Sequence, residues 1–233
     1  FYCDHFFVFN EYYIKQYKKI INSNFHVLGA YRNNIVEVKK SSNKNFLLIS
    51  EYDKDGRDKK IIKSFCKLLE LLNIYFSRSN KKIHILLRRK NSTQKEEMEF
   101  YNKFFKSNCV FHNIFDWKKS YQTVDKFENI IFMQSTLGYE ATARKKKVAC
   151  FQTNLTGSKF WFGWPKPFQK KHYFFTSKYL SYSEVKRILT NLNYCSQSTW
   201  EKKYYNSIKD LVFMDKNNEK FREILSKILK NSI

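Results

Sequence analysis

The sequence predicts an α/β fold built on a doubly wound parallel sheet with helices on both faces. Three features of the 233 residues support this prediction: short apolar runs, amphipathic segments of helical length between them, and polar or glycine-containing segments at the junctions. Helices cover both faces of a parallel strand, so such a strand is apolar along its whole length. Alternation of such strands with helices is typical of a doubly wound sheet.

The regular alternation begins at residue 46. We predict strands at the apolar runs 46–50, 83–87, 129–133 and 147–151, with a weaker candidate at 110–114. Apolar residues at helical spacing predict helices at 60–76, 93–105, 120–127 and 136–144. Thr93 and Glu96 have the spacing of a capping box, so we expect Thr93 to be an N-cap.

The two flanks are less regular. Before residue 46 we expect short strands at 6–9 and 25–29, a helix at 11–22 and a polar boundary region at 35–45. After residue 151 we expect an aromatic segment that holds both prolines, a final strand at 173–176, and helices at 183–192, 199–211 and 217–229. No internal repeat divides the chain.

Composition restricts the partners and the compartment. The formal net charge is +23, but the lysines are dispersed and the longest basic block is 144–147, so we do not expect nucleic acid as a partner. The five cysteines contain no CxxC pair, which argues against a zinc site or a disulfide framework and indicates free thiols in a reducing compartment. No apolar run reaches the roughly 18 residues that span a bilayer. We therefore expect a cytoplasmic protein without a metal.

One strand–helix junction carries the strongest functional signal. The buried run at 129–133 leads through a polar turn into a helix that begins with STLGYE. Helix N-termini present free N–H groups and a positive dipole end, which suit phosphate oxygens, and Ser135 and Thr136 add hydroxyls. Gly138 lets a ligand or the adjacent strand approach closely, and Glu140 can accept hydrogen bonds from a ribose. The alternative is that these residues only cap the helix.

The run STLGYEATARKKKVACF resembles the donor-site helix and following strand of bacterial surface-polysaccharide glycosyltransferases of the GT-B type. Proteins of that family tend to carry Ser-Thr-Leu-Gly-x-Glu-Ala, then Gly-Lys-Lys-Val and an apolar strand. The segments FVFNE, FHVLGAYRNN, FLLIS and IHILLRRK extend the resemblance over roughly residues 6–152. The chain departs from the family where Lys145 or Lys146 replaces a glycine, where 88–90 replaces a Lys-Pro-His-Pro-like turn, and where Ala30 replaces a serine.

The resemblance implies the C-terminal, donor-binding half of a GT-B enzyme. Residues 1–40 would be the end of an N-terminal domain and a linker, 41–195 a Rossmann-like nucleotide-sugar-binding domain, and 196–233 C-terminal helices that pack back on the domains. The implied partners are a nucleotide-sugar donor and a glycan or lipid-linked acceptor, with no further cofactor. The donor nucleotide, the sugar, the stereochemistry and the catalytic residue stay open.

The same resemblance assigns roles to single residues. The two hydroxyls that begin the STLGYE helix would contact the donor phosphate, and Glu140 would hold the ribose. Ser50, Glu51 and Arg88 follow predicted strands, and we expect them in the same cleft because ligands bind beyond the carboxyl ends of parallel strands. Arg88 could balance phosphate charge and His112 could contact the base. The alternatives are a solvated loop residue for Arg88 and a structural histidine for His112.

An aromatic segment, FWFGWP at 160–165, follows the last regular strand. It could form a platform for a sugar or a lipid-linked acceptor, but we favour a plug between the sheet and the final helices. Lysines at 159, 166, 170 and 171 suit a peripheral contact with an anionic membrane.

Two other function classes remain open. A nucleotide-sugar epimerase of the same two-domain architecture would need acid and base groups in the cleft. A non-catalytic basic module would bind nucleic acid or membrane with a steep salt dependence and without nucleotide affinity. Protease, hydrolase and P-loop functions lack their sequence motifs here.

Overall fold

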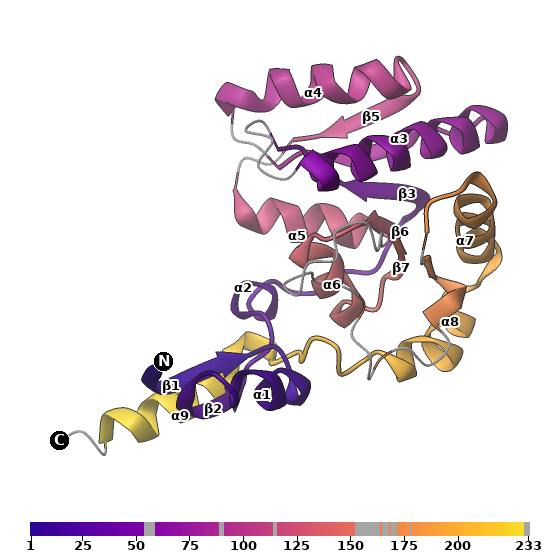
Figure 1. The fold of residues 1–233 in the computed structure, drawn as a ribbon. Helices are drawn as coiled ribbons and strands as arrows, with labels where there is room; N and C mark the ends of the chain where they lie inside the picture. The colour runs from indigo at the N-terminus through magenta and orange to yellow at the C-terminus, as the bar shows by residue number, and fades with distance from the viewer. Residues whose placement is uncertain are drawn as a thin grey trace.

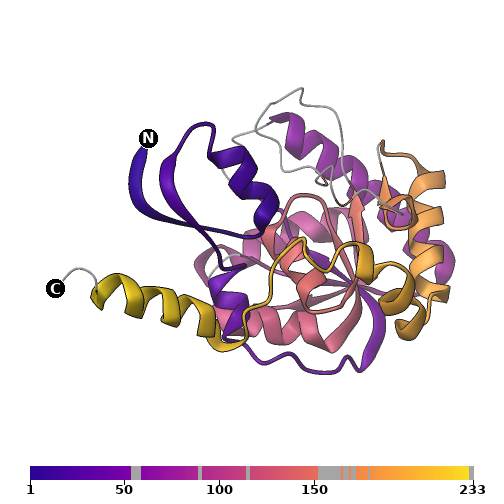
Figure 2. The same cartoon turned by 90° about the horizontal axis from the view of Figure 1, so that it is seen from below.

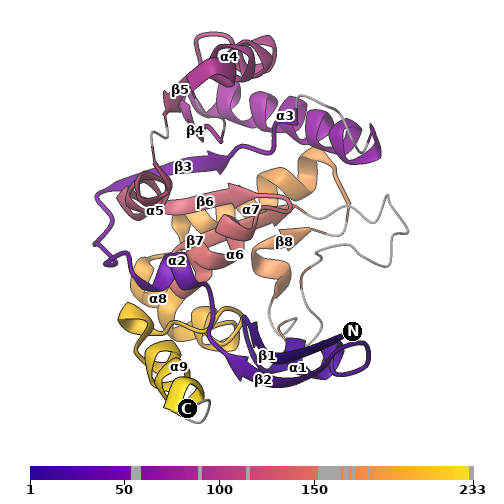
Figure 3. The ribbon, with the colours of Figure 1, turned by 90° about the vertical axis from the view of Figure 1, so that its left-hand side faces the viewer.

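A computed structural model describes residues 1–53, 59–88, 91–113, 116–151, 164, 168, 172–177 and 179–230. Its centre is a six-stranded sheet in which every neighbouring pair is parallel. In spatial order the strands are β5 (Cys109–His112), β4 (Ile83–Leu86), β3 (Asn43–Ile49), β6 (Phe127–Phe132), β7 (Lys147–Phe151) and β8 (Thr176–Ser177). The predicted doubly wound parallel sheet is confirmed (Figure 3).

The order of the strands creates a switch point between β3 and β6. From β3 the chain builds outward to β4 and β5 on one side, then crosses back to build β6, β7 and β8 on the other. Loops that follow β3 and β6 therefore leave the sheet in opposite directions and open a crevice between them, which is where open α/β sheets bind ligands.

Helices cover both faces of the sheet (Figures 1 and 3). On one face α3 (Lys59–Ser79) packs against α4 (Asn91–Phe105) and α7 (Tyr182–Tyr194). On the other lie α5 (Trp117–Lys126), which contacts β6, and α6 (Thr136–Ala143), which contacts β6 and β7. This two-sided cover explains why the runs 46–49, 130–132 and 148–151 of the central strands are apolar.

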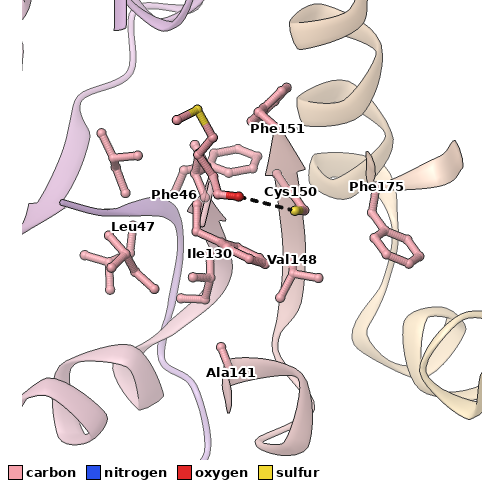
Figure 4. Close-up of a cluster of buried hydrophobic side chains, with 14 of the residues drawn as sticks. Phe46, Leu47, Ile130, Ala141, Val148, Cys150, Phe151 and Phe175 are labelled. Atoms are coloured by element: carbon pink, nitrogen blue, oxygen red, sulfur yellow. Dashed lines mark hydrogen bonds between the residues drawn. The ribbon is translucent and has the colours of Figure 1, made fainter. Parts of the chain in front are cut away.

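Buried apolar side chains of β3, β6 and β7 pack together in the core (Figure 4). Leu47 of β3 pairs with Ile130 of β6, and Ile130 pairs with Val148 of β7; all three side chains are fully buried. Ala141 brings α6 down onto one face of this row, while Phe175 lies beyond β7 (Figure 4). The tight cover leaves the carboxyl edge of the sheet as the place where polar side chains can gather.

The N-terminal segment forms a small unit of its own beside the sheet. Strands β1 (Tyr2–Val8) and β2 (Asn22–Val27) are parallel and joined through α1 (Glu11–Tyr17), and the short α2 (Tyr31–Asn34) follows. The chain end returns to this unit through α8 (Gln197–Lys203) and α9 (Glu219–Lys230). Figure 2 shows α9 extending away from the main body, on the same side as the N-terminal strands.

Two contacts fix this return of the chain. The ring of Phe221 on α9 lies 5.1 Å from the ring of Phe7 and 5.5 Å from that of Tyr31. Gly29, after β2, has φ of +76°, and a side chain there would meet the carbonyl of Phe213. Glycine is required at this position because the conformation is left-handed and the two backbones touch.

A buried ion network joins the linker after α2 to α5 and α6. Arg144, at the end of α6, donates through Nε and Nη2 to the two carboxylate oxygens of Asp125, at 2.8 and 2.5 Å. Its guanidinium also donates to backbone carbonyls between Asn33 and Glu37. Lys146 Nζ lies 3.4 Å from Asp125, and all three charged side chains are at most 4% exposed. The network holds the C-terminal end of α6 against the linker.

The lysines that follow α6 have structural roles. Lys145 stands near the position of the family's glycine and adopts φ of 60°, so a left-handed turn is present without glycine. Lys147 is buried and donates to the carbonyls of Leu192 and Cys195 at the end of α7, at 3.1 and 2.9 Å. A cation suits these carbonyls because they form the negative end of a helix.

Several predicted boundaries were wrong. Helix α4 begins at Asn91, so Thr93 lies inside the helix and is not its N-cap. The helix predicted at 199–211 ends at Lys203 as α8 and gives way to a 3₁₀ turn at Tyr205–Ser207. Helix α5 begins at Trp117, three residues earlier than predicted.

Other predictions fall partly outside the described residues. Of the aromatic segment 160–165 only Trp164 is described; it is buried between the rings of Tyr139 and Phe175, as a plug would be. The lysines at 159, 166, 170 and 171 lie outside the described residues. None of the five cysteines forms a disulfide; Cys150 and Cys195 are buried and the other three are partly exposed. No helix in the described ranges is long and apolar enough to cross a membrane.

Candidate functional site

Two adjoining hollows open at the switch point of the sheet. The first, of about 510 Å³, lies toward α5 and is lined by Trp117, Tyr121 and Glu140 among others; we call it the α5-side hollow. The second, of about 540 Å³, lies toward the end of β3 and is lined by Glu51 and Asp53 among others; we call it the β3-side hollow. Both hollows are also lined by Arg88, Ser135 and Thr136, which therefore form a shared wall between them.

The shared wall contains a helix start whose two hydroxyls, those of Ser135 and Thr136, have no hydrogen-bond partner among the described residues. Four other α-helices have an N-cap side chain that accepts a hydrogen bond from its own helix, namely Asn10, Asp116, Ser181 and Ser196. Ser135, the N-cap of α6, makes no such bond.

The α6 start also leaves N–H groups available. Within the described part of the chain, the N–H groups of Thr136 and Leu137 have no hydrogen-bond partner, whereas those of Gly138 and Tyr139 donate to the carbonyl of Ser135. Free N–H groups, two hydroxyls and the positive end of a helix dipole together suit an anion.

Glu51 fixes the turn that leads into α6. Its Oε1 accepts from the N–H groups of Met133, Gln134 and Ser135, at 2.8, 2.5 and 3.1 Å. Burial raises the pKa of this carboxyl, while the three N–H groups and Arg88 oppose the rise. The carboxylate thus holds the end of β6 in one conformation and places the two hydroxyls in the wall.

Arg88 follows β4, and its backbone is anchored by a buried acid. Its N–H donates to both carboxylate oxygens of Glu97 on α4, at 3.1 and 3.2 Å, and its side chain is exposed to both hollows. Ser50 donates its hydroxyl to the same Glu97 and accepts from the hydroxyl of Tyr101 at 2.8 Å. Ser50 is fully buried and lines neither hollow, so the structure does not support a direct ligand contact from it.

On the α5 side, Glu140 is held by a tyrosine. The hydroxyl of Tyr121 donates to Glu140 Oε2 at 2.6 Å. Burial raises the pKa of Glu140, although the tyrosine, Arg144 and Arg32 favour its charged form. Burial and the adjacent carboxylate raise the pKa of Tyr121, so it stays protonated and keeps donating.

An aromatic ring and an arginine that contact each other also line the α5-side hollow. The guanidinium of Arg32, from α2, lies over the ring of Trp117 at 5.8 Å. Asp116, just before this tryptophan, accepts from the N–H of Lys119 and starts α5. A flat ring beside a hollow can stack on a planar ligand group.

Trp117, Tyr121 and Arg32 were not among the predicted site residues. The signal was present, because the first two are four residues apart and face the same way on a helix. The predicted start of that helix at residue 120 hid the pattern.

Besides Ser50, two of the predicted site residues lie elsewhere. Gly138 lines neither hollow; a Cβ on it would come within 2.1 Å of Cγ of Phe132, so its role is close packing of α6 on β6. His112 also lines neither hollow. Its Nε2 is 2.9 Å from Nδ1 of His84, and the two rings pack against Phe127.

The structure therefore gathers five of the eight predicted residues around the hollows, namely Glu51, Arg88, Ser135, Thr136 and Glu140. Among the described residues, no group of three or more His, Cys, Asp or Glu side chains is arranged to hold a metal ion.

Comparisons with known proteins bear on the family and the fold. A family profile described as "putative O-antigen biosynthesis protein" matches residues 1–229. No curated protein matches the sequence.

Solved structures share the fold. The UDP-GlcNAc 2-epimerase of Methanocaldococcus jannaschii, in complex with UDP-GlcNAc and UDP, matches with a TM-score of 0.61 and 14% identity over 96% of this chain and 61% of that one. A chain in the structure of accessory secretory proteins 1, 2 and 3 of Streptococcus pneumoniae matches with a TM-score of 0.54 and 12% identity, over 97% of this chain and 42% of that one. Sucrose-phosphate synthase of Thermosynechococcus elongatus matches with a TM-score of 0.52 and 9% identity, over 98% of this chain and 59% of that one.

The TM-scores show a common fold, the Rossmann-like architecture of GT-B glycosyltransferases and epimerases. The chain spans between 42 and 61% of the length of these three structures.

Proposed function

Because this chain belongs to the O-antigen biosynthesis family and has a GT-B fold, we propose that it binds a nucleotide-sugar and takes part in transferring the sugar to a surface polysaccharide or lipid-linked glycan. The observation that carries the proposal is the shared wall. Ser135 and Thr136 offer hydroxyls that the helix itself does not use, at the point where both hollows meet.

Each part of a nucleotide-sugar has a matching surface around this wall. The phosphates would lie against the start of α6 and accept hydrogen bonds from it, with Arg88 as the neutralising cation. The nucleoside would occupy the α5-side hollow, where Glu140 can accept from ribose hydroxyls and Trp117 can stack on the base. The tyrosine bond to Glu140 leaves its other oxygen for the ribose.

The same wall would assist the chemistry. Breaking the bond between sugar and phosphate leaves negative charge on the departing nucleotide. Hydrogen-bond donors already aimed at that phosphate stabilise the charge without reorganising, which is the largest contribution in many enzymes. The proposed reaction takes place in the cytoplasm, where the lipid-linked acceptor would be reached at the inner face of the membrane.

Calorimetric titration with UDP, GDP and CMP tests the proposal. We expect one of the three to bind with a Kd between about 1 μM and 1 mM, the range in which nucleotide substrates are commonly held. Absence of binding by all three would remove the proposal, because phosphate recognition is its basis.

Product analysis separates transfer from epimerisation. The protein is incubated with the sugar conjugate of the nucleotide that binds, without an acceptor. A transferase leaves the configuration of the sugar unchanged, whereas an epimerase yields a new stereoisomer that is still attached to the nucleotide. The second result would replace glycosyl transfer with epimerisation.

A further inference from the structure

One carboxylate in the α5-side hollow bears on the kind of nucleotide that the protein accepts. Glu140 follows Thr136 by four residues on α6, so the two side chains lie on the same face of the helix, about 6 Å apart along its axis. Both residues line the α5-side hollow. If the proposed function holds, a phosphate at Thr136 places the ribose that carries it beside Glu140.

Glu140 has one engaged and one open oxygen. Its Oε2 accepts from the hydroxyl of Tyr121 at 2.6 Å, whereas its Oε1 has no hydrogen-bond partner among the described residues. In that part of the chain, the buried side-chain oxygen and nitrogen atoms that lack a partner are Oδ1 of Asn129 and Nε1 of Trp200. Oε1 is therefore not sealed inside the protein, although Glu140 is only 8% exposed, and it opens on the hollow that this residue lines.

Tyr121 holds this carboxylate from a position that is itself fixed. The guanidinium of Arg144 lies 5.5 Å from the centre of the tyrosine ring, and the ring of Trp117 meets it edge-on at 6.2 Å. Arg144 is in turn held by both carboxylate oxygens of Asp125. Because the tyrosine is buried among these groups, its hydroxyl has little freedom to move, and it fixes the direction in which the open oxygen of Glu140 points.

An open carboxylate oxygen at this place suits two neighbouring hydroxyls. An ionised carboxylate only accepts hydrogen bonds, and each of its oxygens can accept two. The 2′ and 3′ hydroxyls of a ribose are adjacent donors on one side of the ring, whereas a 2′-deoxyribose keeps only the 3′ hydroxyl. A bound deoxynucleotide would exclude water from Oε1 of Glu140 and still leave it one donor short, which is costly for a charged group in a partly buried site.

From this arrangement we infer that Tyr121 is a positioning residue that directs Glu140 toward the ribose, and that the site accepts donors linked to a ribonucleotide and rejects donors linked to a 2′-deoxyribonucleotide. Sugars activated with UDP, GDP or CMP belong to the first class, and sugars activated with deoxythymidine diphosphate belong to the second. The inference rests on the proposed function, because it requires a nucleotide in the α5-side hollow.

Nucleotides that share a base and differ only at the 2′ position test this inference. The tightest binder among UDP, GDP and CMP is compared by calorimetry with its own 2′-deoxy analogue, so that contacts to the base cancel. Titrations are run at pH 8, because burial raises the pKa of Glu140 and the test requires its charged form. We expect the wild-type protein to bind the ribonucleotide at least about tenfold more tightly, since the lost bond is one to a charged group. Equal affinities, or a preference for the deoxynucleotide, would overturn the inference.

Tyr121→Phe tests the positioning role, because it removes the hydroxyl and keeps the ring. Without its donor the carboxylate of Glu140 is free to turn, so we expect the ratio of the two affinities to fall below about threefold. A tyrosine that only supported the fold would, when altered, weaken both nucleotides alike and leave the ratio unchanged. An unchanged ratio in the folded variant therefore removes the positioning role.

Two further variants complete the test. Tyr75→Phe is the matched control, because it removes the hydroxyl of a half-buried tyrosine on α3 that lines neither hollow, and it should leave the ratio unchanged. Glu140→Gln removes the negative charge at nearly the same size and should also lower the ratio below about threefold, which keeps the inference testable if Tyr121→Phe does not fold. A wild-type ratio in Glu140→Gln refutes the inference, whereas a protein that binds none of the three ribonucleotides refutes the proposed function instead.

Discussion

Replacing Asp125 with alanine tests the buried network that fixes the linker to α5 and α6. The carboxylate receives two bonds from Arg144, lies 3.4 Å from Lys146 and accepts the N–H of Lys39 at 3.1 Å. Its side chain is 1% exposed, and those of the two cations are 0% and 4% exposed. The substitution would leave both cations in a low-dielectric interior without a counter-charge.

The expected loss follows from these contacts. Removing one partner of a buried ion pair costs about 3–5 kcal/mol, because the partner charge remains buried. A second cation adds to that loss, but burial already lowers the pKa of Lys146, so it can release its proton and limit the cost. We therefore expect Asp125→Ala to lower the free energy of unfolding by about 4 kcal/mol, which is a large part of the stability of a typical domain.

Urea unfolding followed by tryptophan fluorescence measures this change. The control is Glu70→Ala, which breaks an ion pair whose two side chains are 54% and 56% exposed, and whose loss should cost less than about 0.5 kcal/mol. A loss below about 1 kcal/mol for Asp125→Ala would refute the assignment of this network as the element that holds the linker.

Three further predictions concern packing, the nucleoside and pH. Gly138→Ala places a Cβ 2.1 Å from Cγ of Phe132, and we expect a loss of about 2 kcal/mol in thermal unfolding; an unchanged Tm would contradict the close packing of α6. Trp117→Ala should weaken nucleotide binding about tenfold in calorimetry, because a base would lose its stacking partner; unchanged affinity would place the base elsewhere. Burial and the neighbouring His84 lower the pKa of His112 to about 4, so between pH 6.5 and 4 the unfolded chain takes up a proton that the folded chain does not. The free energy of unfolding should therefore fall as the pH decreases over that interval. Because the ring is half-buried, we expect a loss of only about 1 kcal/mol, and no such loss in His112→Phe. Equal pH profiles of the wild-type protein and this variant would contradict the prediction.

The sheet could be predicted from the sequence because each central strand contains a continuous apolar run. The physical cause of that pattern is that helices cover both faces of the sheet, and Leu47, Ile130 and Val148 within these runs are fully buried. Helix boundaries were harder to predict, since α4 starts at Asn91 although Thr93 and Glu96 have the spacing of a capping box. Local capping preference is worth about 1 kcal/mol and yields to tertiary packing.

The site could be predicted only for those polar residues at the strand ends whose side chains line a hollow. Ser50 and Glu51 are adjacent at the end of one strand, yet only Glu51 lines a hollow. The hydroxyl of Ser50 instead donates a hydrogen bond to the buried Glu97. The sequence cannot show this difference, because Glu97 lies on a helix that follows a different strand. His112 was misplaced for a similar reason, as its partner His84 lies on the neighbouring strand.

The affinity of the shared wall for a nucleotide tests the central claim most directly. Calorimetry compares the wild-type protein with the double variant Ser135→Ala, Thr136→Val and with the control Ser181→Ala, which removes a hydroxyl that caps a distant helix. Two hydroxyl bonds to a charged phosphate contribute about 3 kcal/mol, so the double variant should bind the nucleotide at least about tenfold more weakly while the control binds as the wild type does. Equal affinity in the wild type and the double variant would contradict the account.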